Sequence, residues 1–284
     1  MTHRAWIALM TLLPAAAGPS SVPDGPHNIA HRGASGHAPE HTFLAWDLAR
    51  SMGADYLEQD LQMTADGVLV VLHDATLDRT ARGPAGSCSG PVRERTLEEI
   101  RRCEVGSWFN ERSPDRARSD YVGARIPTLD EVFERYGADV RYYIETKQPD
   151  EAPGMEEALL ELMDRHGLTR AAEHEGRVLI QSFSPASLRL IHERNPRLPL
   201  IQLLGSDSAE VISSLDGVTE YAMGIGPSAS AVTAEVVAAA KARGLLVHPY
   251  TVNEPAEMET LLELGVDGMF TDYPDRLASL LEGR

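Results

Sequence analysis

Acidic side chains occupy alternate positions in one β-rich segment of the sequence. Glu58 and Asp60 lie two residues apart there, and a β-strand presents such positions on the same face. Two neighbouring carboxylates repel each other unless a cation lies between them. The pattern therefore indicates either a metal site or the solvated face of a surface strand. Glu145, in a later β-rich segment, supplies a third carboxylate, and three oxygen ligands suit Mg²⁺ or Ca²⁺ better than zinc.

Two histidines, His31 and His73, each end an apolar run that we expect to be a strand. A histidine at a strand end is often structural, but two imidazoles can divide the roles of general base and general acid near neutral pH. Two cationic residues lie close by in the sequence, Arg32 and Lys147, and their side chains are suited to binding phosphate oxygens. For Lys147 the alternative is a simple ion pair with Glu145.

A hairpin is expected to bring one of these histidines to the carboxylates. Residues 62–67 are too few for a crossover helix, and they end in Asp66-Gly67, a strong hairpin signal. If the chain folds back about Asp66, His73 lies opposite residues 58–60.

Strand-like and helix-like patterns alternate along the chain, which is typical of βα units. The strands are predicted at residues 27–31, 55–61, 68–73, 141–146, 178–183, 198–204, 221–226, 245–251 and 268–271. The helices are predicted at residues 42–51, 129–136, 155–165, 184–194, 208–215, 234–242 and 255–264. The predicted fold class is therefore α/β, a TIM-type (β/α) barrel, which places its functional residues at the carboxyl ends of its strands.

Residues 77–125 interrupt the repeat as a long, arginine-rich, turn-rich segment, which we call the 77–125 insertion. Long loops within compact domains tend to be functional, and we expect this one to cover one face of the barrel. It holds the two cysteines of the chain, Cys88 and Cys103. In an oxidising compartment such a pair favours a disulfide, and two unrelated buried thiols are the alternative.

The first residues have the pattern of an export signal, with Arg4 before an apolar run at residues 5–13 and then small residues up to Ala17. The apolar run is shorter than the roughly 20 residues that span a bilayer, which disfavours an uncleaved anchor helix. We therefore expect a signal at 1–17, a polar linker at 18–26 and a barrel domain at 27–284, secreted or extracytoplasmic and without a stable membrane span once the signal is removed.

The formal net charge of the 284-residue chain is −17. This charge argues against a nucleic-acid partner, because phosphate backbones are bound by clustered Lys and Arg. It also repels small anionic substrates at long range, so that a phosphate-binding site would need a local cation such as a metal ion.

Taken together, an ordered series of short motifs resembles the glycerophosphodiester phosphodiesterase family across nearly the whole chain after the linker. The motifs are His31-Arg32-Gly33, Ala38-Pro39-Glu40, Glu58-x-Asp60, His73-Asp74, Glu145-x-Lys147, Gln181-Ser182-Phe183, Thr251-Val252-Asn253 and Thr271-Asp272-Tyr273-Pro274. The resemblance implies a TIM-type barrel with an insertion after its third strand run, here residues 77–125.

By the same resemblance, the chain has a full set of site residues. Glu58, Asp60 and Glu145 match the metal ligands, His31 and His73 match the catalytic acid and base, and Arg32 and Lys147 match phosphate-contacting positions. We also interpret Glu40 as a residue that orients His31 or Arg32.

Two positions depart from the family's pattern. His41 stands where members usually have Asn, and Tyr250 stands where many have Trp. We expect neither residue to touch the metal ligands, and we expect both to bear on recognition of the headgroup.

The implied activity is metal-dependent hydrolysis of small glycerophosphodiesters to glycerol 3-phosphate and an alcohol. The attacking group is either the neighbouring glycerol hydroxyl or water. A lysophospholipase D or sphingomyelinase D-like activity is the alternative, with Trp108, Phe109 and Tyr121 lining a groove for a lipid tail. A non-catalytic module that binds phosphodiesters is an alternative of another class. We favour the small substrate because no long apolar stripe runs through the 77–125 insertion.

Overall fold

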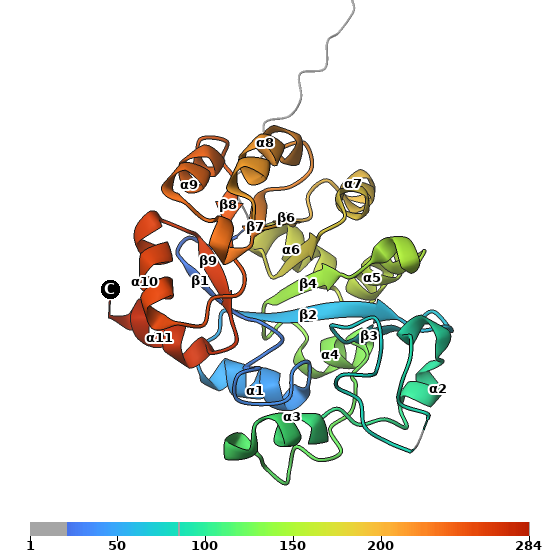
Figure 1. Cartoon of the computed structure of the whole chain (residues 1–284). Helices are drawn as coiled ribbons and strands as arrows, with labels where there is room; N and C mark the ends of the chain where they lie inside the picture. Colours follow the sequence, from blue (N-terminus) through green and yellow to red (C-terminus); the bar gives the residue numbers. More distant parts are fainter. Residues whose placement is uncertain (1–21, 85, 284) are drawn as a thin grey trace, which may run out of the picture.

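The computed structural model describes residues 22–84 and 86–283 and shows a nearly closed parallel barrel surrounded by helices (Figure 1). Within these residues the parallel strands follow the order β8-β7-β6-β5-β4-β2-β1-β9, and the short β3 pairs with β2. The strands are β1 His27–Ala30, β2 Tyr56–Met63, β3 Leu69–Val71, β4 Tyr142–Thr146, β5 Val178–Ser182, β6 Leu200–Leu204, β7 Gly224–Pro227, β8 Leu246–Val247 and β9 Gly268–Thr271. The predicted TIM-type barrel is confirmed.

The two end strands of this order approach each other through backbone hydrogen bonds. Asp267 donates its N–H to the carbonyl of Val247 (3.0 Å), and Phe270 donates to Pro249 (2.9 Å). Strand β8 is shorter than the predicted strand at 245–251, because beyond Val247 the chain makes single backbone bonds to the segments on either side and no regular ladder.

The predicted hairpin is confirmed. Strands β2 and β3 are antiparallel, with Leu61 opposite Val71 and Met63 opposite Leu69. One step further along, Leu72 donates its N–H to the backbone carbonyl of Asp60 (3.0 Å). His73, the next residue, therefore lies beside the part of β2 that carries Asp60.

Helices cover the outside of the barrel. They are α1 Phe43–Ser51, α4 Leu129–Tyr136, α5 Met155–Arg165, α6 Leu168–Glu175, α7 Pro185–Arg194, α8 Ser208–Val218, α9 Ala234–Lys241, α10 Pro255–Leu264 and α11 Pro274–Glu282. The seven predicted helices are present, and α6 and α11 are additional. Helix α6 follows α5 directly through Gly167, whose positive φ of 68° turns the chain. Helix α11 begins at Pro274, a residue suited to a first helical turn.

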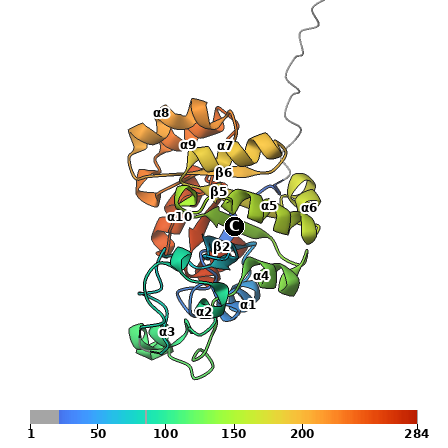
Figure 2. The same ribbon diagram turned by 90° about the vertical axis from the view of Figure 1, so that its right-hand side faces the viewer.

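The 77–125 insertion contains two further short helices, α2 Leu97–Ile100 and α3 Ser107–Arg112. Figures 1 and 2 place both in the lower half of the views, on the side of the barrel away from α8 and α9. Cys88 and Cys103 form a disulfide with a Cα–Cα distance of 5.6 Å, so the pairing predicted for an oxidising compartment is present.

Aromatic residues form the core of the 77–125 insertion. Trp108, Phe109 and Tyr121 are 5%, 3% and 6% exposed, and they pack in one cluster with Leu77 and Ile100. Only small parts of Trp108 and Phe109 reach the lining of a cavity of about 310 Å³, and Tyr121 does not line it, so the three side chains mainly pack against one another. Burial of a compact aromatic core explains why this segment is ordered despite its many turn residues.

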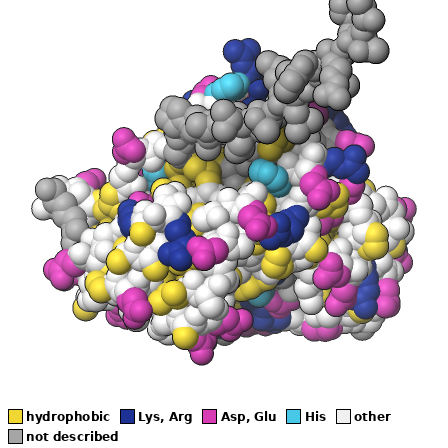
Figure 3. Space-filling model, turned by 90° about the horizontal axis from the view of Figure 1, so that it is seen from above, with side chains coloured by type: hydrophobic (Ala, Val, Ile, Leu, Met, Phe, Trp, Pro, Cys, Tyr) yellow, Lys and Arg dark blue, Asp and Glu magenta, His cyan; other side chains and the backbone are white. Residues whose placement is uncertain are grey.

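The surface mixes both signs of charge, and in the view of Figure 3 acidic side chains are spread over the face with Lys and Arg among them. No helix in the described part of the chain is long and apolar enough to cross a membrane. The predicted signal at residues 1–17 lies outside the described residues.

Candidate active site

The three predicted acids lie on the adjacent strands β2 and β4, two in the middle of β2 and one near the carboxyl end of β4. Glu58 and Asp60 belong to β2 and are each 1% exposed, so the surface-strand alternative is excluded. Glu145 is aligned with Asp60 in the pairing of β2 with β4 and is 6% exposed. All three line one pocket of about 220 Å³, which His31 and His73 also line.

These carboxyl groups depend on nearby cations for their ionisation. Burial, together with the charge of Asp60, raises the pKa of both Glu58 and Glu145 well above the usual range. Burial acts in the same direction on Asp60, but Lys147, His41 and Arg32 hold its pKa well below the usual range. A divalent cation would favour ionisation of the whole set, so the donor atoms fit a hard metal ion.

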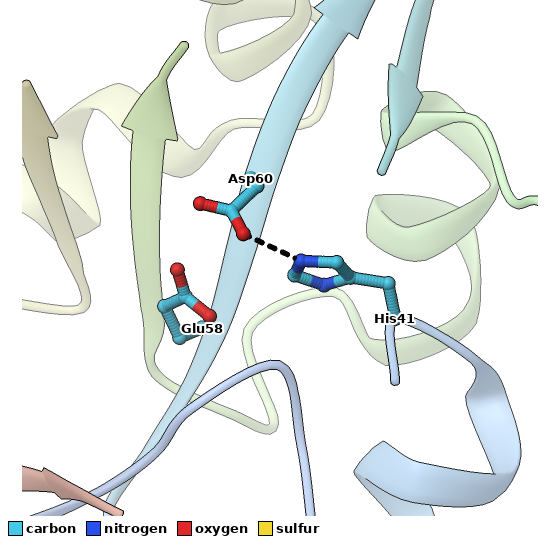
Figure 4. Close-up of side chains that lie close together, drawn as sticks. All are labelled: His41, Glu58 and Asp60. Atoms are coloured by element: carbon cyan, nitrogen blue, oxygen red, sulfur yellow. Dashed lines mark hydrogen bonds and ion pairs between the residues drawn. The ribbon is translucent and has the colours of Figure 1, made fainter. Parts of the chain in front are cut away.

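His41 is the residue for which the sequence-based expectation was wrong. Its Nε2 lies 2.8 Å from Oδ2 of Asp60, and within the described residues His41, Glu58 and Asp60 form a group of potential metal ligands whose ligand atoms all lie within 4.8 Å of one another (Figure 4). The cause is local: His41 has a left-handed backbone, φ 55°, and donates its N–H to the carbonyl of Arg32 (3.0 Å). This turn directs the imidazole towards Asp60 of β2, and the side chain of His41 is buried there, with 1% of its surface exposed.

Glu145 does not belong to the group of potential ligands formed by His41, Glu58 and Asp60. Its Oε1 lies 3.2 Å from Nζ of Lys147, so the two side chains form the ion pair that was the alternative for this lysine. Lys147 also lies 3.9 Å from Oδ1 of Asp60, and its side chain is 15% exposed within the pocket. The ammonium group is therefore positioned between two of the acids and at the pocket surface.

His31, at the carboxyl end of β1, is held by an aspartate that the sequence analysis did not assign to the site. Its Nδ1 lies 2.7 Å from Oδ1 of Asp272, which follows β9. Asp272 also accepts hydrogen bonds from Ser35 Oγ (2.8 Å) and Asn253 Nδ2 (2.7 Å). Although burial acts in the opposite direction, the hydrogen bond from His31 lowers the pKa of Asp272. An ionised carboxylate can only accept, so Nδ1 of His31 carries the proton.

His73 has the same arrangement on the other side of the pocket. Its Nδ1 lies 2.6 Å from Oδ1 of Asp74, and Arg79 donates from Nε to Oδ2 of the same carboxylate (2.6 Å). The hydrogen bond from His73 and then that from Arg79 lower the pKa of Asp74. In both pairs the carboxylate occupies Nδ1, so Nε2 is the nitrogen that faces the pocket; Nε2 of His31 also accepts a hydrogen bond from Nε of Arg32 (3.2 Å). A carboxylate on the far nitrogen is the arrangement expected of acid–base catalysts.

Arg32 joins these groups through its backbone and its side chain. Its left-handed backbone, φ 59°, allows its N–H to donate to Oε2 of Glu58 (2.6 Å). The next residue, Gly33, lies so close to α1 that a Cβ would be 2.8 Å from the Cβ of Ala45, which explains the need for glycine. The guanidinium donates to Glu40 (3.1 Å) and lies 3.2 Å from Nε2 of His31.

Glu40 is placed where it can orient Arg32, and it also binds Arg79 through both oxygens (2.8 and 2.7 Å). Burial acts against the charged form, but hydrogen bonds from Arg79 and the charge of Arg32 lower the pKa of Glu40 to about 2. Asp74, Arg79 and Asp272 were not predicted as site residues from the sequence. The signal for the two aspartates was present, since each follows a strand within a quoted motif.

Comparisons with known proteins agree with this geometry. A model of the Glycerophosphoryl diester phosphodiesterase family matches residues 31–276. A glycerophosphodiester phosphodiesterase of Bacillus subtilis (strain 168) is 46% identical over 263 residues, which cover 92% of this chain and 88% of that protein. A crystal structure from Silicibacter pomeroyi DSS-3 has a TM-score of 0.80 and 29% identity and covers 92% of this chain and 94% of that chain. An Oleispira antarctica phosphodiesterase in complex with the product sn-glycerol-3-phosphate has a TM-score of 0.73 and 27% identity, with coverage of 89% and 96%.

Proposed function

The chain belongs to the glycerophosphoryl diester phosphodiesterase family, and from this we propose that it hydrolyses glycerophosphodiesters to glycerol 3-phosphate and an alcohol. The observation that carries the proposal is the single pocket in which three buried acids meet two histidines, each with an aspartate on its Nδ1. The product bound in the Oleispira antarctica relative supports the choice of substrate class.

We propose Glu58, Asp60 and Glu145 as the residues that hold a divalent metal, Mg²⁺ or Ca²⁺, with His41 beside them. The family is typically metal-dependent. When bound, such an ion neutralises charge on the phosphate and lowers the pKa of a coordinated hydroxyl. The oxygen donors favour these hard cations over zinc.

The protein's own groups carry the proton transfers. One imidazole takes the proton of the attacking hydroxyl, and the other donates a proton to the oxygen of the departing alcohol. Asp74 and Asp272 hold the two Nδ1–H groups and stabilise whichever imidazole becomes charged. Arg32 and Lys147 bind phosphate oxygens and thereby offset the anionic charge that repels a nucleophile.

Two routes use these groups equally. In one, the neighbouring glycerol hydroxyl forms a new P–O bond as the bond to the alcohol breaks, and water then opens the cyclic phosphate while the imidazoles exchange roles. In the other, water attacks phosphorus directly. Both yield glycerol 3-phosphate and one alcohol for each water consumed.

The test is a panel of water-soluble glycerophosphodiesters, assayed with metal-stripped protein to which Mg²⁺ or Ca²⁺ is returned. We expect turnover without detergent only when a cation is restored. Glu58→Gln should lose both turnover and calorimetric metal binding, whereas His73→Ala should retain metal binding and lose turnover. Near-normal rates in Glu58→Gln would contradict the assigned role.

We also propose that the chain is exported, on the basis of the signal pattern at residues 1–17 and a disulfide that suits an oxidising compartment. Sequencing the amino terminus of protein recovered outside the cytoplasm tests this. A mature chain that begins after Ala17 is the expected result, and retention of Met1 in cytoplasmic protein would oppose it.

A further inference from the structure

A second cavity adjoins the catalytic pocket. It has a volume of about 310 Å³ and lies between the barrel and the 77–125 insertion, whose side is lined by three arginines and two aromatic residues, Arg79, Arg112, Arg116, Trp108 and Phe109. The two cavities share His31 and Arg32 in their linings, so they meet at the predicted phosphate position. A ligand whose phosphate is bound at Arg32 can therefore extend into both.

The lining of the second cavity carries an excess of positive charge. It contains four arginines, Arg32, Arg79, Arg112 and Arg116, against the two carboxylates of Glu40 and Asp272. Arg32 and Arg79 are each paired with two carboxylates, because Glu40 binds both, Asp60 lies 3.6 Å from Arg32 and Asp74 lies 2.6 Å from Arg79. The excess therefore belongs to Arg112 and Arg116.

Arg116 is held in place by neutral groups. Its Nη1 donates to the carbonyl of Gly36 and lies 3.2 Å from the hydroxyl of Tyr273, and its guanidinium stacks at 5.5 Å from the Tyr273 ring centroid. Its acidic neighbour, Asp115, is 3.6 Å away and 76% exposed, so that ion pair is weak. The guanidinium is thus fixed at the cavity wall without being neutralised.

Arg112 is exposed and lies over Trp108, with its guanidinium 6.0 Å from the ring centroid. No carboxylate among the described residues forms an ion pair with it. A chain with a net charge of −17 has many acids available, yet among the described residues the exposed Asp115 is the one carboxylate that forms an ion pair with either guanidinium group. Such a local cationic site attracts anionic ligands even though the net negative charge of the protein repels them at long range.

The catalytic pocket indicates which part of the substrate reaches this second cavity. The glycerol part belongs with the acids, because its hydroxyl is the one the metal site would hold, and Phe183 and Tyr250 line the same pocket. In a displacement at phosphorus the attacking and leaving oxygens lie roughly in line. The departing alcohol therefore lies on the side of the phosphate opposite the glycerol hydroxyl, towards the second cavity. His31 lines this cavity, whereas His73 does not.

We propose that this arginine-lined cavity binds a second phosphate carried by the departing alcohol, and that the preferred substrates are glycerophosphodiesters whose alcohol is itself phosphorylated. This inference rests on the proposed function. It assigns His31 as the group that protonates the departing oxygen and His73 as the base. Water is consumed, glycerol 3-phosphate keeps one phosphorus, and the alcohol leaves with its proton and its own phosphate.

The test compares two substrates that differ only beyond the departing oxygen. Glycerophosphoglycerol has a neutral alcohol, whereas bis(glycerophospho)glycerol has the same alcohol extended by a second phosphodiester. We expect the wild type to have the higher kcat/KM on the second. The double variant Arg112→Gln/Arg116→Gln should lower this preference at least about tenfold, as for loss of charge-assisted hydrogen bonds at a partly exposed site.

Arg118→Gln is the matched control, because Arg118 lies on the same insertion but pairs with Asp120 and lines neither cavity. Its preference should equal that of the wild type. If the double variant does not fold because the hydrogen bond from Arg116 to Gly36 is lost, the single variant Arg112→Gln can be tested in its place.

Three results would overturn the inference. A wild type without preference for the dianionic substrate refutes it while leaving the proposed function intact, since glycerophosphoglycerol is still cleaved. An equal loss on both substrates in the arginine variants also refutes it. Absence of turnover on every glycerophosphodiester removes the proposed function and this inference together.

Discussion

Substitution of Glu40 by Gln removes one charge from a buried cluster. Glu40 is 8% exposed and accepts hydrogen bonds from Arg32 and from both terminal nitrogens of Arg79. Glutamine keeps the shape and one acceptor oxygen but not the charge. The two guanidinium groups would then lose the negative charge that offsets their own in a partly buried site. This loss destabilises the folded state.

The pKa of Glu40 gives the size of the effect. Folding lowers it from the ordinary value of 4.5 to about 2. This difference corresponds to a stabilisation of about 3 kcal/mol when the group is ionised. Because the pKa is lowered in the folded state, the stabilisation is complete above pH 4.5 and is lost as the pH falls towards 2.

Urea unfolding followed by far-ultraviolet circular dichroism tests this prediction, in EDTA and at several pH values from 7 down to 3. We expect Glu40→Gln to unfold with about 3 kcal/mol less free energy at pH 7, and this deficit should shrink below about pH 4.5. The control is Glu111→Gln, whose ion pair with Arg82 (2.7 Å) is exposed. It should cost less than about 1 kcal/mol. A deficit in Glu40→Gln that equals the control, or that stays constant down to pH 3, would refute the reasoning.

Three other variants probe separate parts of the molecule. Replacing Cys88 and Cys103 by Ser opens a loop with a sequence separation of 15, so the free energy of unfolding should fall by about 3 kcal/mol in the same urea assay. Asp272→Asn leaves Nδ1 of His31 without its carboxylate, so kcat should fall about 100-fold or more with little change in KM, as steady-state kinetics would show. His41→Asn restores the residue usual in the family but removes the contact to Asp60, so calorimetry should show metal affinity reduced about tenfold or more.

Local rules predicted much of the fold and part of the site. Period-two alternation placed Glu58 and Asp60 on one face, and Asp66-Gly67 predicted the hairpin that carries His73 to them. The contact of His41 with Asp60 could not be predicted in this way, because it depends on left-handed backbones at Arg32 and His41. Only the packed turn between β1 and α1 selects those conformations.

The side-chain contacts between the barrel and the insertion could not be predicted from local sequence patterns either. Arg79 reaches back across 39 positions of sequence to Glu40, and the same guanidinium holds the carboxylate that binds His73. Glu40 in turn binds Arg32, which donates its backbone N–H to Glu58. One arginine of the insertion thus contacts both Glu40, which binds Arg32, and Asp74, which binds His73.

This connection gives the disulfide a role beyond stability. The Cys88–Cys103 bond closes the middle of the insertion, with Arg79 before it and Arg112 and Arg116 after it. Restricting this segment keeps both its contact with the catalytic groups and the cationic wall of the second cavity in one arrangement. Loss of the disulfide should therefore reduce the preference for a dianionic substrate in protein that is still folded, because that preference needs both arginines at the wall at once. Unchanged preference in the folded Cys88→Ser/Cys103→Ser variant would show that the aromatic core of Trp108, Phe109 and Tyr121 is sufficient to hold the wall.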